Sequence, residues 1–260
     1  MPDPIVSHNL NGPVGTIIMD DPATRNSLST ELIQAMTAAI DELHKEARVL
    51  VLRARPGVRT WSSGHSVKEL PTHGRDPLAY GDPLRTLIRR IRDCSRPVIA
   101  MVEGGVWGGA CEVVMTCDVR IVAKNTTFAL TPAKLGVPYN MAGVLNMMGA
   151  ANPTLVREML YRARPIDAEK ALARGLVNEV VPNEELEART MEIAGEIATN
   201  SPMVLALLKE QLKVLSEAAP LTPETFERVQ GMRRAIYDSE DYQEGIRSFF
   251  EKRPPQFQGR

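Results

Sequence analysis

The chain has 260 residues, of which 43% are hydrophobic and 24% charged, and its formal net charge is -1. This composition is that of an ordinary globular protein, with room for one large domain or two small ones. The nearly neutral charge gives no support for nucleic acid or an anionic membrane surface as a partner.

Targeting and redox signals are absent from the sequence. No apolar stretch approaches the roughly 18 residues that a membrane-spanning helix needs. The N-terminus lacks the basic region followed by an apolar region that marks a signal peptide. Cys94, Cys111 and Cys117 are too few, and wrongly spaced, for a disulfide framework or a Cys-x-x-Cys metal site. We therefore expect reduced, packed cysteines, a cytoplasmic location and no membrane partner.

Apolar runs rich in β-branched residues predict strands in the first half of the chain. These runs are Val14–Met19, Val49–Leu52, Val98–Val102 and Val119–Ala123. Between them, apolar residues recur at helical spacing from Leu28 to Leu43 and from Leu84 to Ile91. Continuous apolar strands that alternate with helices are typical of a mostly parallel sheet that is buried on both faces. The sequence thus predicts an α/β fold.

From Pro132 onward strand signals become sparse, and proline and asparagine separate segments with helical patterns. The expected helices are Pro153–Tyr161, Asp167–Arg174, Asn183–Ala198, Pro202–Ala218, Pro223–Tyr237 and Asp241–Lys252. The two prolines after Arg253 predict an extended C-terminal tail. We place the change from the sheet core to a helical region near residue 200.

Two turns, each after a predicted strand, carry the clearest chemical signal. One is the Gly-rich turn from Gly104 to Glu112, and the other runs from Trp61 to Ser66. Free N–H groups at a helix N-terminus bind anions, and glycine lets a ligand approach the backbone closely. Together the turns predict a two-sided oxyanion hole. The alternative for the Gly-rich turn is tight packing of strand against helix. Its glycines match neither a dinucleotide fingerprint nor a Walker loop.

Other motifs favour less specific interpretations. His65 and Glu69 have the spacing of a metal-binding pair on a helix, but no third ligand lies close in sequence, so no metal site is expected. The absence of a G-x-S-x-G elbow weakens a serine hydrolase hypothesis. Four arginines are expected on a solvated helix face, opposite its apolar stripe, with ligand phosphate or nucleic acid as the alternative partner. They are Arg85, Arg89, Arg90 and Arg92.

Several short motifs occur in a specific order along the chain. They are Asn26-Ser27-Leu28, Ser62-Ser63-Gly64-His65, Gly104–Glu112, Cys117-Asp118, Phe128–Gly136 and Glu251-Lys252-Arg253. In this order they resemble the crotonase (enoyl-CoA hydratase/isomerase) superfamily. The resemblance implies a ClpP/crotonase-like spiral of ββα units over residues 1–200, which holds CoA and the active site. A C-terminal helical region, residues 201–260, would make the contacts of a homotrimer or of a hexamer built from two trimers.

Further stretches narrow the resemblance to the methylmalonyl-CoA decarboxylases of this superfamily that use no biotin. They are Gly74-Arg75-Asp76-Pro77-Leu78, Leu135-Gly136-Val137-Pro138-Tyr139-Asn140, Gly231-Met232-Arg233-Arg234-Ala235 and Tyr237-Asp238-Ser239-Glu240-Asp241-Tyr242. One departure is Ser66, where many relatives carry Asp. The implied reaction is decarboxylation of methylmalonyl-CoA to propionyl-CoA. CoA would then be part of the substrate, and no biotin, metal or nucleotide cofactor is expected.

The acid and base residues separate this reaction from hydration. A hydratase of this family needs two glutamates to activate water and move a proton. Glu112 matches the first position, but the second falls on Pro132, which cannot titrate. Decarboxylation is therefore favoured. A hydratase, isomerase or thioesterase, a decarboxylase of malonyl- or ethylmalonyl-CoA, and a non-catalytic CoA- or RNA-binding relative remain alternatives.

The resemblance also implies roles for individual residues. The backbone N–H groups of His65 and Gly109 would hold the thioester oxygen, and the Tyr139 hydroxyl would orient the substrate carboxylate. A packed core tyrosine is the alternative for Tyr139. Thr131 would lie beside the acyl part, and Lys252 would reach the CoA phosphates, unless it is a solvated tail residue. The remaining predicted CoA contacts come from the backbone of Ser63, Gly64, His65, Ser66 and Val67.

Overall fold

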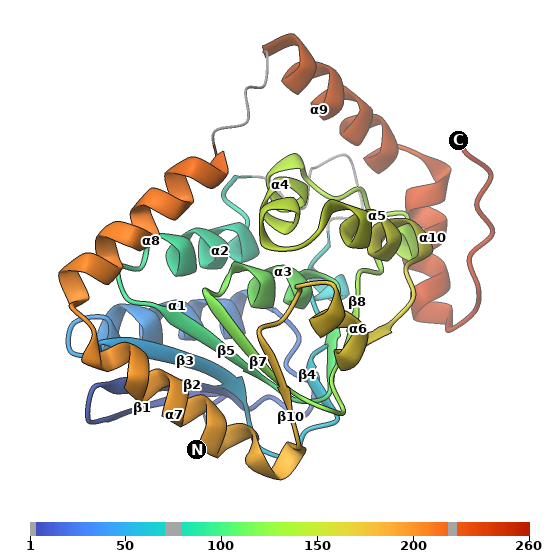
Figure 1. Ribbon diagram of the computed structural model, residues 1–260. Coiled ribbons are helices and arrows are strands. Elements are labelled where there is room, and N and C mark those ends of the chain that lie inside the picture. Colours follow the sequence, from blue (N-terminus) through green and yellow to red (C-terminus); the bar gives the residue numbers. More distant parts are fainter. Residues whose placement is uncertain (1–3, 71–79, 218–222) are drawn as a thin grey trace.

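The computed structural model describes residues 4–70, 80–217 and 223–260 (Figure 1). The motif Gly74-Arg75-Asp76-Pro77-Leu78 and the predicted helix end at Ala218 lie outside the described residues. Across the described part of the chain, none of the helices has the length and apolar character needed to cross a membrane.

A sheet of six strands forms the centre of the protein. In spatial order the strands are β1 (Val6–Asn11), β2 (Val14–Met19), β3 (Val49–Ala54), β5 (Val98–Val102), β7 (Val119–Ala123) and β10 (Glu179–Val181). β1 pairs antiparallel with β2, and all other neighbours are parallel. The four strands predicted from sequence are confirmed as the parallel centre of this sheet.

Helices cover both faces of the sheet (Figure 1). On β3, Leu50 packs into the cluster formed with α1 (Thr30–Leu43) and α2 (Pro83–Asp93). Its neighbour Val49 packs into the cluster formed with α7 (Leu186–Thr199) on the opposite face. Because successive side chains of a strand alternate between faces, a strand covered on both sides is largely apolar, and Arg53 near the end of β3 pairs with Glu187.

A second, smaller sheet positions the loops that matter for function. Its strands, in spatial order, are β4 (Thr60–Ser62), β6 (Gly105–Trp107), β8 (Thr127–Ala129) and β9 (Ile166–Asp167). β4, β6 and β8 are parallel, and each directly follows a strand of the large sheet along the chain. The loops that follow β4, β6 and β8 therefore begin at the same edge of this small sheet. The sequence does not predict these strands, because three residues are too few to show an alternating pattern.

The other elements are mostly helical. They are η1 (Val67–Glu69), α3 (Gly109–Thr116), η2 (Pro132–Leu135), α4 (Met141–Ala150), α5 (Pro153–Arg162), α6 (Ala168–Ala173), η3 (Asn183–Glu185), α8 (Pro202–Glu217), α9 (Pro223–Tyr237) and α10 (Glu240–Glu251). The helices predicted after residue 150 are confirmed, with small shifts at their ends. α4 was not predicted, because its nearly continuous apolar sequence has no single helical stripe.

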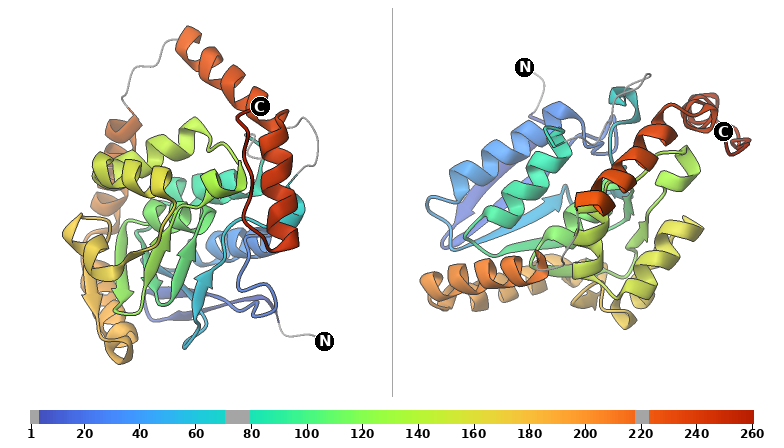
Figure 2. Two further views of the ribbon diagram at one scale, coloured as in Figure 1. Left: turned by 90° about the vertical axis from the view of Figure 1, so that its right-hand side faces the viewer. Right: turned by 90° about the horizontal axis from the view of Figure 1, so that it is seen from above.

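The C-terminal helices extend beyond the sheet (Figures 1 and 2). α8 is attached to the core by Lys209, whose Nζ donates to the backbone oxygen of Ile91 at the end of α2. Several large apolar side chains of α8 nevertheless face solvent: Met203 is 82% exposed, Leu215 71% and Leu212 68%. Such an apolar surface on a single chain indicates an interface with another molecule.

Candidate active site

The loops that follow β4 and β6 are in direct backbone contact. Gly64, after β4, has a φ of +86°, in the left-handed region that favours glycine. A Cβ built on Gly64 would lie only 2.4 Å from the backbone oxygen of Trp107, the last residue of β6. Any larger residue would push the loops apart. We call Gly64, His65, Gly108 and Gly109 the backbone corner.

Two amide groups, those of His65 and Gly109, lie close together in the backbone corner. A Cβ built on Gly109 would lie 3.6 Å from the backbone nitrogen of His65. Gly109 is the first residue of α3, so no carbonyl of that helix accepts its N–H. Leu28 bonds with Gly64 and Ser66 on either side of His65, and the N–H of His65 therefore points away from Leu28. Two donors on adjacent loops can bind a negatively charged oxygen.

The backbone from Ser63 to Val67 is held firmly next to this corner. The amide of Ser63 donates to the oxygen of Arg25 at 3.0 Å, and its hydroxyl donates to the oxygen of Thr24, also at 3.0 Å. Ser66 is buried, and Val67 begins η1. The segment predicted to bind CoA is thus ordered by its own contacts, whereas its role remains a prediction.

Thr131 and Lys252 have different surroundings. The Oγ1 atom of Thr131 lies 3.9 Å from a Cβ built on Gly108, so this side chain borders the backbone corner. Lys252 is exposed at the C-terminal end of α10. Within the described residues, no hydrogen bond or ion pair connects Lys252 to the backbone corner.

The imidazole of His65 is bound to the start of α2. Its Nε2 lies 3.4 Å from Oδ2 of Asp82, and its Nδ1 lies 3.2 Å from the oxygen of Ser66. Asp82 also caps α2 by accepting from the amide of Leu84 at 2.8 Å. Burial lowers the pKa of His65, but the hydrogen bond and negative charge of Asp82 outweigh it, so the pKa is raised. The side chain thus anchors the loop that carries the backbone donor.

A second group of functional residues consists of Arg85, Glu112 and Tyr139, which we call the side-chain corner. Nη1 of Arg85, on α2, pairs with Oε1 of Glu112, on α3. Both residues are buried, with 6% and 1% of their surface exposed. Burial raises the pKa of the Glu112 carboxyl, and the positive charge of Arg85 opposes this shift. One oxygen of Glu112 is therefore occupied by a buried ion pair.

The prediction that Arg85 belongs to a solvated arginine face is wrong. Arg85 lies three residues before Ile88, on the side of α2 that packs into the core. Arg89 and Arg90 are half-buried, and Arg90 pairs with Asp41. The spacing of Arg85 from Ile88 is the sequence signal that places Arg85 on the buried side of α2. This signal can be interpreted only when the buried carboxylate opposite Arg85 is known.

Tyr139 lies just before α4, with its ring against the Glu112 carboxylate. A Cβ built on Gly143 would lie 2.8 Å from Cε1 of Tyr139 and 3.0 Å from Oε2 of Glu112. The Tyr139 hydroxyl is buried beside the Glu112 carboxylate, and no hydrogen bond of ordinary geometry joins it to any of the described residues. Burial, together with the charge of Glu112, raises its pKa well above the usual value. Tyr139 therefore presents a neutral hydroxyl with a proton to donate.

The carboxylate of Glu69 binds Thr30 and not His65. It accepts from the amide and the hydroxyl of Thr30, the latter at 2.7 Å. Among the described residues, no three or more His, Cys, Asp or Glu side chains are grouped so that they could hold a metal ion. Pro132, which the resemblance aligns with the second hydratase glutamate, begins η2.

The three cysteines are free thiols in the interior, which confirms the prediction that they are packed and unpaired. Burial raises the pKa of Cys111 to about 12 and that of Cys117 to about 12. Neither thiol is suited to act as a nucleophile near neutral pH.

Comparisons with known proteins agree with this architecture. The sequence profile of the enoyl-CoA hydratase/isomerase family matches residues 9–260. Methylmalonyl-CoA decarboxylase of Escherichia coli (strain K12) is 48% identical over 235 residues, covering 90% of each chain. Carnitinyl-CoA dehydratase of Salmonella typhi is 32% identical over 254 residues, covering 96% of this chain and 97% of the relative.

A solved structure shows the same fold. Methylmalonyl-CoA decarboxylase in complex with 2-nitronate-propionyl-CoA superimposes with a TM-score of 0.97 and 45% identity, over 98% of this chain and 99% of the other. The predicted crotonase fold is thereby confirmed. The chain belongs to the enoyl-CoA hydratase/isomerase family.

Proposed function

We propose that this member of the enoyl-CoA hydratase/isomerase family decarboxylates methylmalonyl-CoA to propionyl-CoA. The single observation that carries the proposal is the combination of two neighbouring backbone donors with one buried hydroxyl that makes no hydrogen bond of ordinary geometry to the described residues. The similarity to a decarboxylase over nine-tenths of the chain supports the choice of substrate.

The proposed chemistry needs a place for one negative charge. The bond between Cα and the carboxylate breaks, CO₂ leaves, and the electron pair passes through Cα to the thioester oxygen, which gives an enolate. The amides of His65 and Gly109 would donate to that oxygen. The enolate carbon then takes a proton, and propionyl-CoA results. Donors fixed before the reaction are effective because they need no rearrangement as the charge develops.

Tyr139 would orient the substrate carboxylate. The breaking bond must be perpendicular to the thioester plane, so that its electrons overlap the carbonyl π system. A hydrogen bond from the buried Tyr139 hydroxyl would hold the carboxylate in this orientation. No hydrogen bond of ordinary geometry holds the hydroxyl among the described residues, so its proton would be free to bind the substrate carboxylate.

The same geometry argues against hydration. Water addition needs two titratable groups beside the substrate. Glu112 is paired with Arg85, and Pro132 takes the place of the second carboxylate. The neighbouring backbone of Ser63–Val67 would bind CoA, with Thr131 beside the acyl group and Lys252 directed to the CoA phosphates. The proposed reaction uses no biotin, metal or nucleotide, because the thioester itself accepts the electron pair.

The exposed apolar residues of α8 support a homotrimer or a hexamer, with residues 201–260 as the oligomerisation region and 1–200 as the core. Light scattering is expected to give a mass of three or six chains. Leu212→Asp, on α8, is expected to reduce that mass, whereas Leu172→Asp, on α6 and 39% exposed, serves as a control. A monomeric wild type would contradict the proposal.

The buried free thiols are compatible with the proposed cytoplasmic location.

The decisive test of function is a product screen by mass spectrometry. The purified protein is incubated separately with malonyl-, methylmalonyl-, ethylmalonyl- and crotonyl-CoA. We expect propionyl-CoA and CO₂ from methylmalonyl-CoA, and little or no hydration of crotonyl-CoA. Hydration as fast as decarboxylation would overturn the proposal, and faster turnover of another malonyl thioester would change the substrate but not the reaction.

A second test addresses Tyr139. Tyr139→Phe removes one hydroxyl and keeps the ring, so kcat on methylmalonyl-CoA should fall more than CoA affinity does. The dissociation constant of propionyl-CoA should be nearly unchanged, because the product has no carboxylate. A Tyr139→Phe enzyme with wild-type kcat and KM would show that Tyr139 contributes only to packing.

A further inference from the structure

The loop that carries Thr131 and Tyr139 has little regular structure of its own. It consists of η2 and a turn in which the amide of Val137 donates to the oxygen of Pro132 at 3.0 Å. A loop of this kind needs contacts from outside to hold one side chain in a defined direction. The C-terminal helices provide these contacts.

Two glycines let the loop and α10 touch through their backbones. A Cβ built on Gly245, in α10, would lie 2.1 Å from the oxygen of Leu135. A Cβ built on Gly136, in the loop, would lie 2.8 Å from the oxygen of Asp241. Gly136 also has a φ of +63°. Neither position accepts a larger residue without a shift of the loop against the helix.

A hydrogen bond from α9 reaches the residue before Tyr139. The hydroxyl of Tyr237, at the end of α9, donates to the backbone oxygen of Pro138 at 3.3 Å. Tyr237 is only 3% exposed, and its ring packs edge-to-face on Tyr242, with centroids 5.2 Å apart. The oxygen of Pro138 and the nitrogen of Tyr139 belong to one planar peptide unit. A hydrogen bond to the Pro138 oxygen therefore fixes the orientation of the peptide plane that leads into Tyr139.

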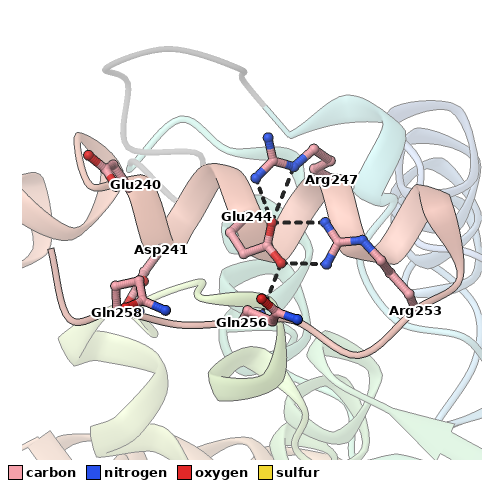
Figure 3. A pocket seen from close by; sticks show the side chains of 7 residues that line it. All are labelled: Glu240, Asp241, Glu244, Arg247, Arg253, Gln256 and Gln258. Atoms are coloured by element: carbon pink, nitrogen blue, oxygen red, sulfur yellow. Dashed lines mark hydrogen bonds and ion pairs between the residues drawn. The ribbon is translucent and has the colours of Figure 1, made fainter.

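The C-terminal tail holds α10 in place behind this loop. Residues 254–260 form neither helix nor strand, as predicted, and run alongside α10 (Figure 2). The carboxylate of Glu244 in α10 accepts from the guanidinium of Arg253 and from the amide of Gln256 (Figure 3). Asp241 accepts from the amides of Gln258 and Gly259, at 2.6 and 2.8 Å.

The hollow beside α10 in Figure 3 does not itself form a ligand site. Its two arginines, Arg247 and Arg253, both pair with Glu244 at 2.6 Å. These pairs hold the pKa of Glu244 well below its usual range. Arg253 also pairs with Glu251 at 2.6 Å, so two carboxylates balance the two arginines and leave no uncompensated charge for an anion.

We propose that Tyr237 is a positioning residue for the reaction, because its hydrogen bond to Pro138 sets the direction in which Tyr139 presents its hydroxyl. This inference rests on the proposed role of Tyr139 in orienting the substrate carboxylate. The proposed positioning gives a role to the sequence motif from Tyr237 to Tyr242. This motif contributes no group to the backbone corner. The oxyanion donors lie on other loops and are independent of this contact.

The test is a double-mutant cycle on the full-length enzyme, with kcat and the dissociation constant of propionyl-CoA as readouts. Tyr237→Phe should lower kcat about tenfold, less than the roughly hundredfold loss that a full ångström of misplacement can cause. Propionyl-CoA affinity should not change. In the Tyr139→Phe background, Tyr237→Phe should have no further effect on kcat, since the hydroxyl that it positions is gone. Tyr161→Phe, an exposed hydroxyl on α5, is the matched control.

Gly245→Ala provides a second variant, because its methyl group would displace the loop from the α10 side. It should also lower kcat and lose its effect in the Tyr139→Phe background. Wild-type kcat in Tyr237→Phe, or an equal loss in both backgrounds, would overturn the positioning role while leaving the proposed function intact. If Tyr139→Phe alone is neutral, the proposed role of Tyr139 fails, and this inference fails with it.

Discussion

The backbone corner and the side-chain corner are built on the same short helix. Gly109, the first residue of α3, contributes an amide to the backbone corner. Glu112, one turn later, contributes a carboxylate to the side-chain corner. The two regions are thus one helical turn apart along α3, but different physical conditions maintain them.

The backbone corner depends on the absence of side chains. Its donors are main-chain groups, and its geometry requires that Gly64 approach the oxygen of Trp107 closely. The side-chain corner depends on charge, because Glu112 is almost completely buried and needs Arg85 as its partner. Steric changes should therefore damage the first region, and changes of charge should damage the second.

The largest effect is expected from breaking the buried ion pair. Arg85→Met leaves the Glu112 carboxylate buried without a partner, which typically costs about 3–5 kcal/mol of folding stability. The free energy of unfolding, measured in denaturant at fixed protein concentration, should fall by this amount. Adding Glu112→Gln to Arg85→Met should restore much of the loss. No recovery in the double variant would show that Arg85 contributes mainly through packing.

The next largest effect is expected from deleting one backbone donor. Gly109→Pro removes the N–H, although proline is well tolerated at the first position of a helix. The decarboxylation rate should fall by about 10²–10³, the usual loss for one oxyanion-hole donor. Gly109→Ala is the control, because it keeps the N–H and its Cβ would meet only the flexible end of Leu84, at 2.8 Å. Equal losses in both variants would point to crowding as the cause.

The two corners also differ in how far the sequence predicts them. The backbone corner could be located in advance because glycine-rich turns after apolar strands are local patterns. The pairing of β4 with β6, which brings Gly64 and Gly109 together, is a long-range contact between strands too short to recognise. The central sheet is easier to predict, because runs of four to six mostly apolar residues rich in β-branched side chains leave few alternatives to a strand.

The side-chain corner could be predicted only in part. The family resemblance predicts a role for Tyr139 and matches Glu112 to a hydratase glutamate, whereas the helical pattern places Arg85 in solvent. An arginine on an amphipathic helix usually faces water, and only the fold reveals the buried carboxylate opposite it. The contact between Tyr237 and Pro138 spans 99 residues of sequence, and no local pattern indicates it.

A smaller effect is expected from the imidazole of His65, and it would sharpen the distinction between backbone and side chain. His65→Ala removes the ring but keeps the amide that is proposed to bind the enolate oxygen. The decarboxylation rate should fall by less than about tenfold, which corresponds to ~1.4 kcal/mol in the barrier. Steady-state kinetics on methylmalonyl-CoA would measure it. A loss comparable with that of Gly109→Pro would assign the chemistry to the ring.

The smallest effect concerns the pair of His65 and Asp82, a charge pair that contacts the backbone corner directly. Asp82→Asn keeps the helix cap, because asparagine caps as well as aspartate does, but it removes the charge beside the imidazole. The folded-state pKa of His65 is raised above its ordinary value of 6.5. The pair therefore contributes stability that is fully present below this ordinary value and is lost as the pH rises through the folded-state pKa.

The difference in unfolding free energy between wild type and Asp82→Asn should thus be largest near pH 5.5 and should shrink towards pH 8.5, with an upper size of about 1 kcal/mol. Denaturant unfolding at several pH values measures this difference. In a His65→Ala background the pH dependence should disappear, since no titrating partner remains. A difference that is constant with pH, or grows on the alkaline side, would mean that Asp82 acts only as the cap of α2. The backbone corner would then be maintained by glycine geometry alone, with no contribution from charge.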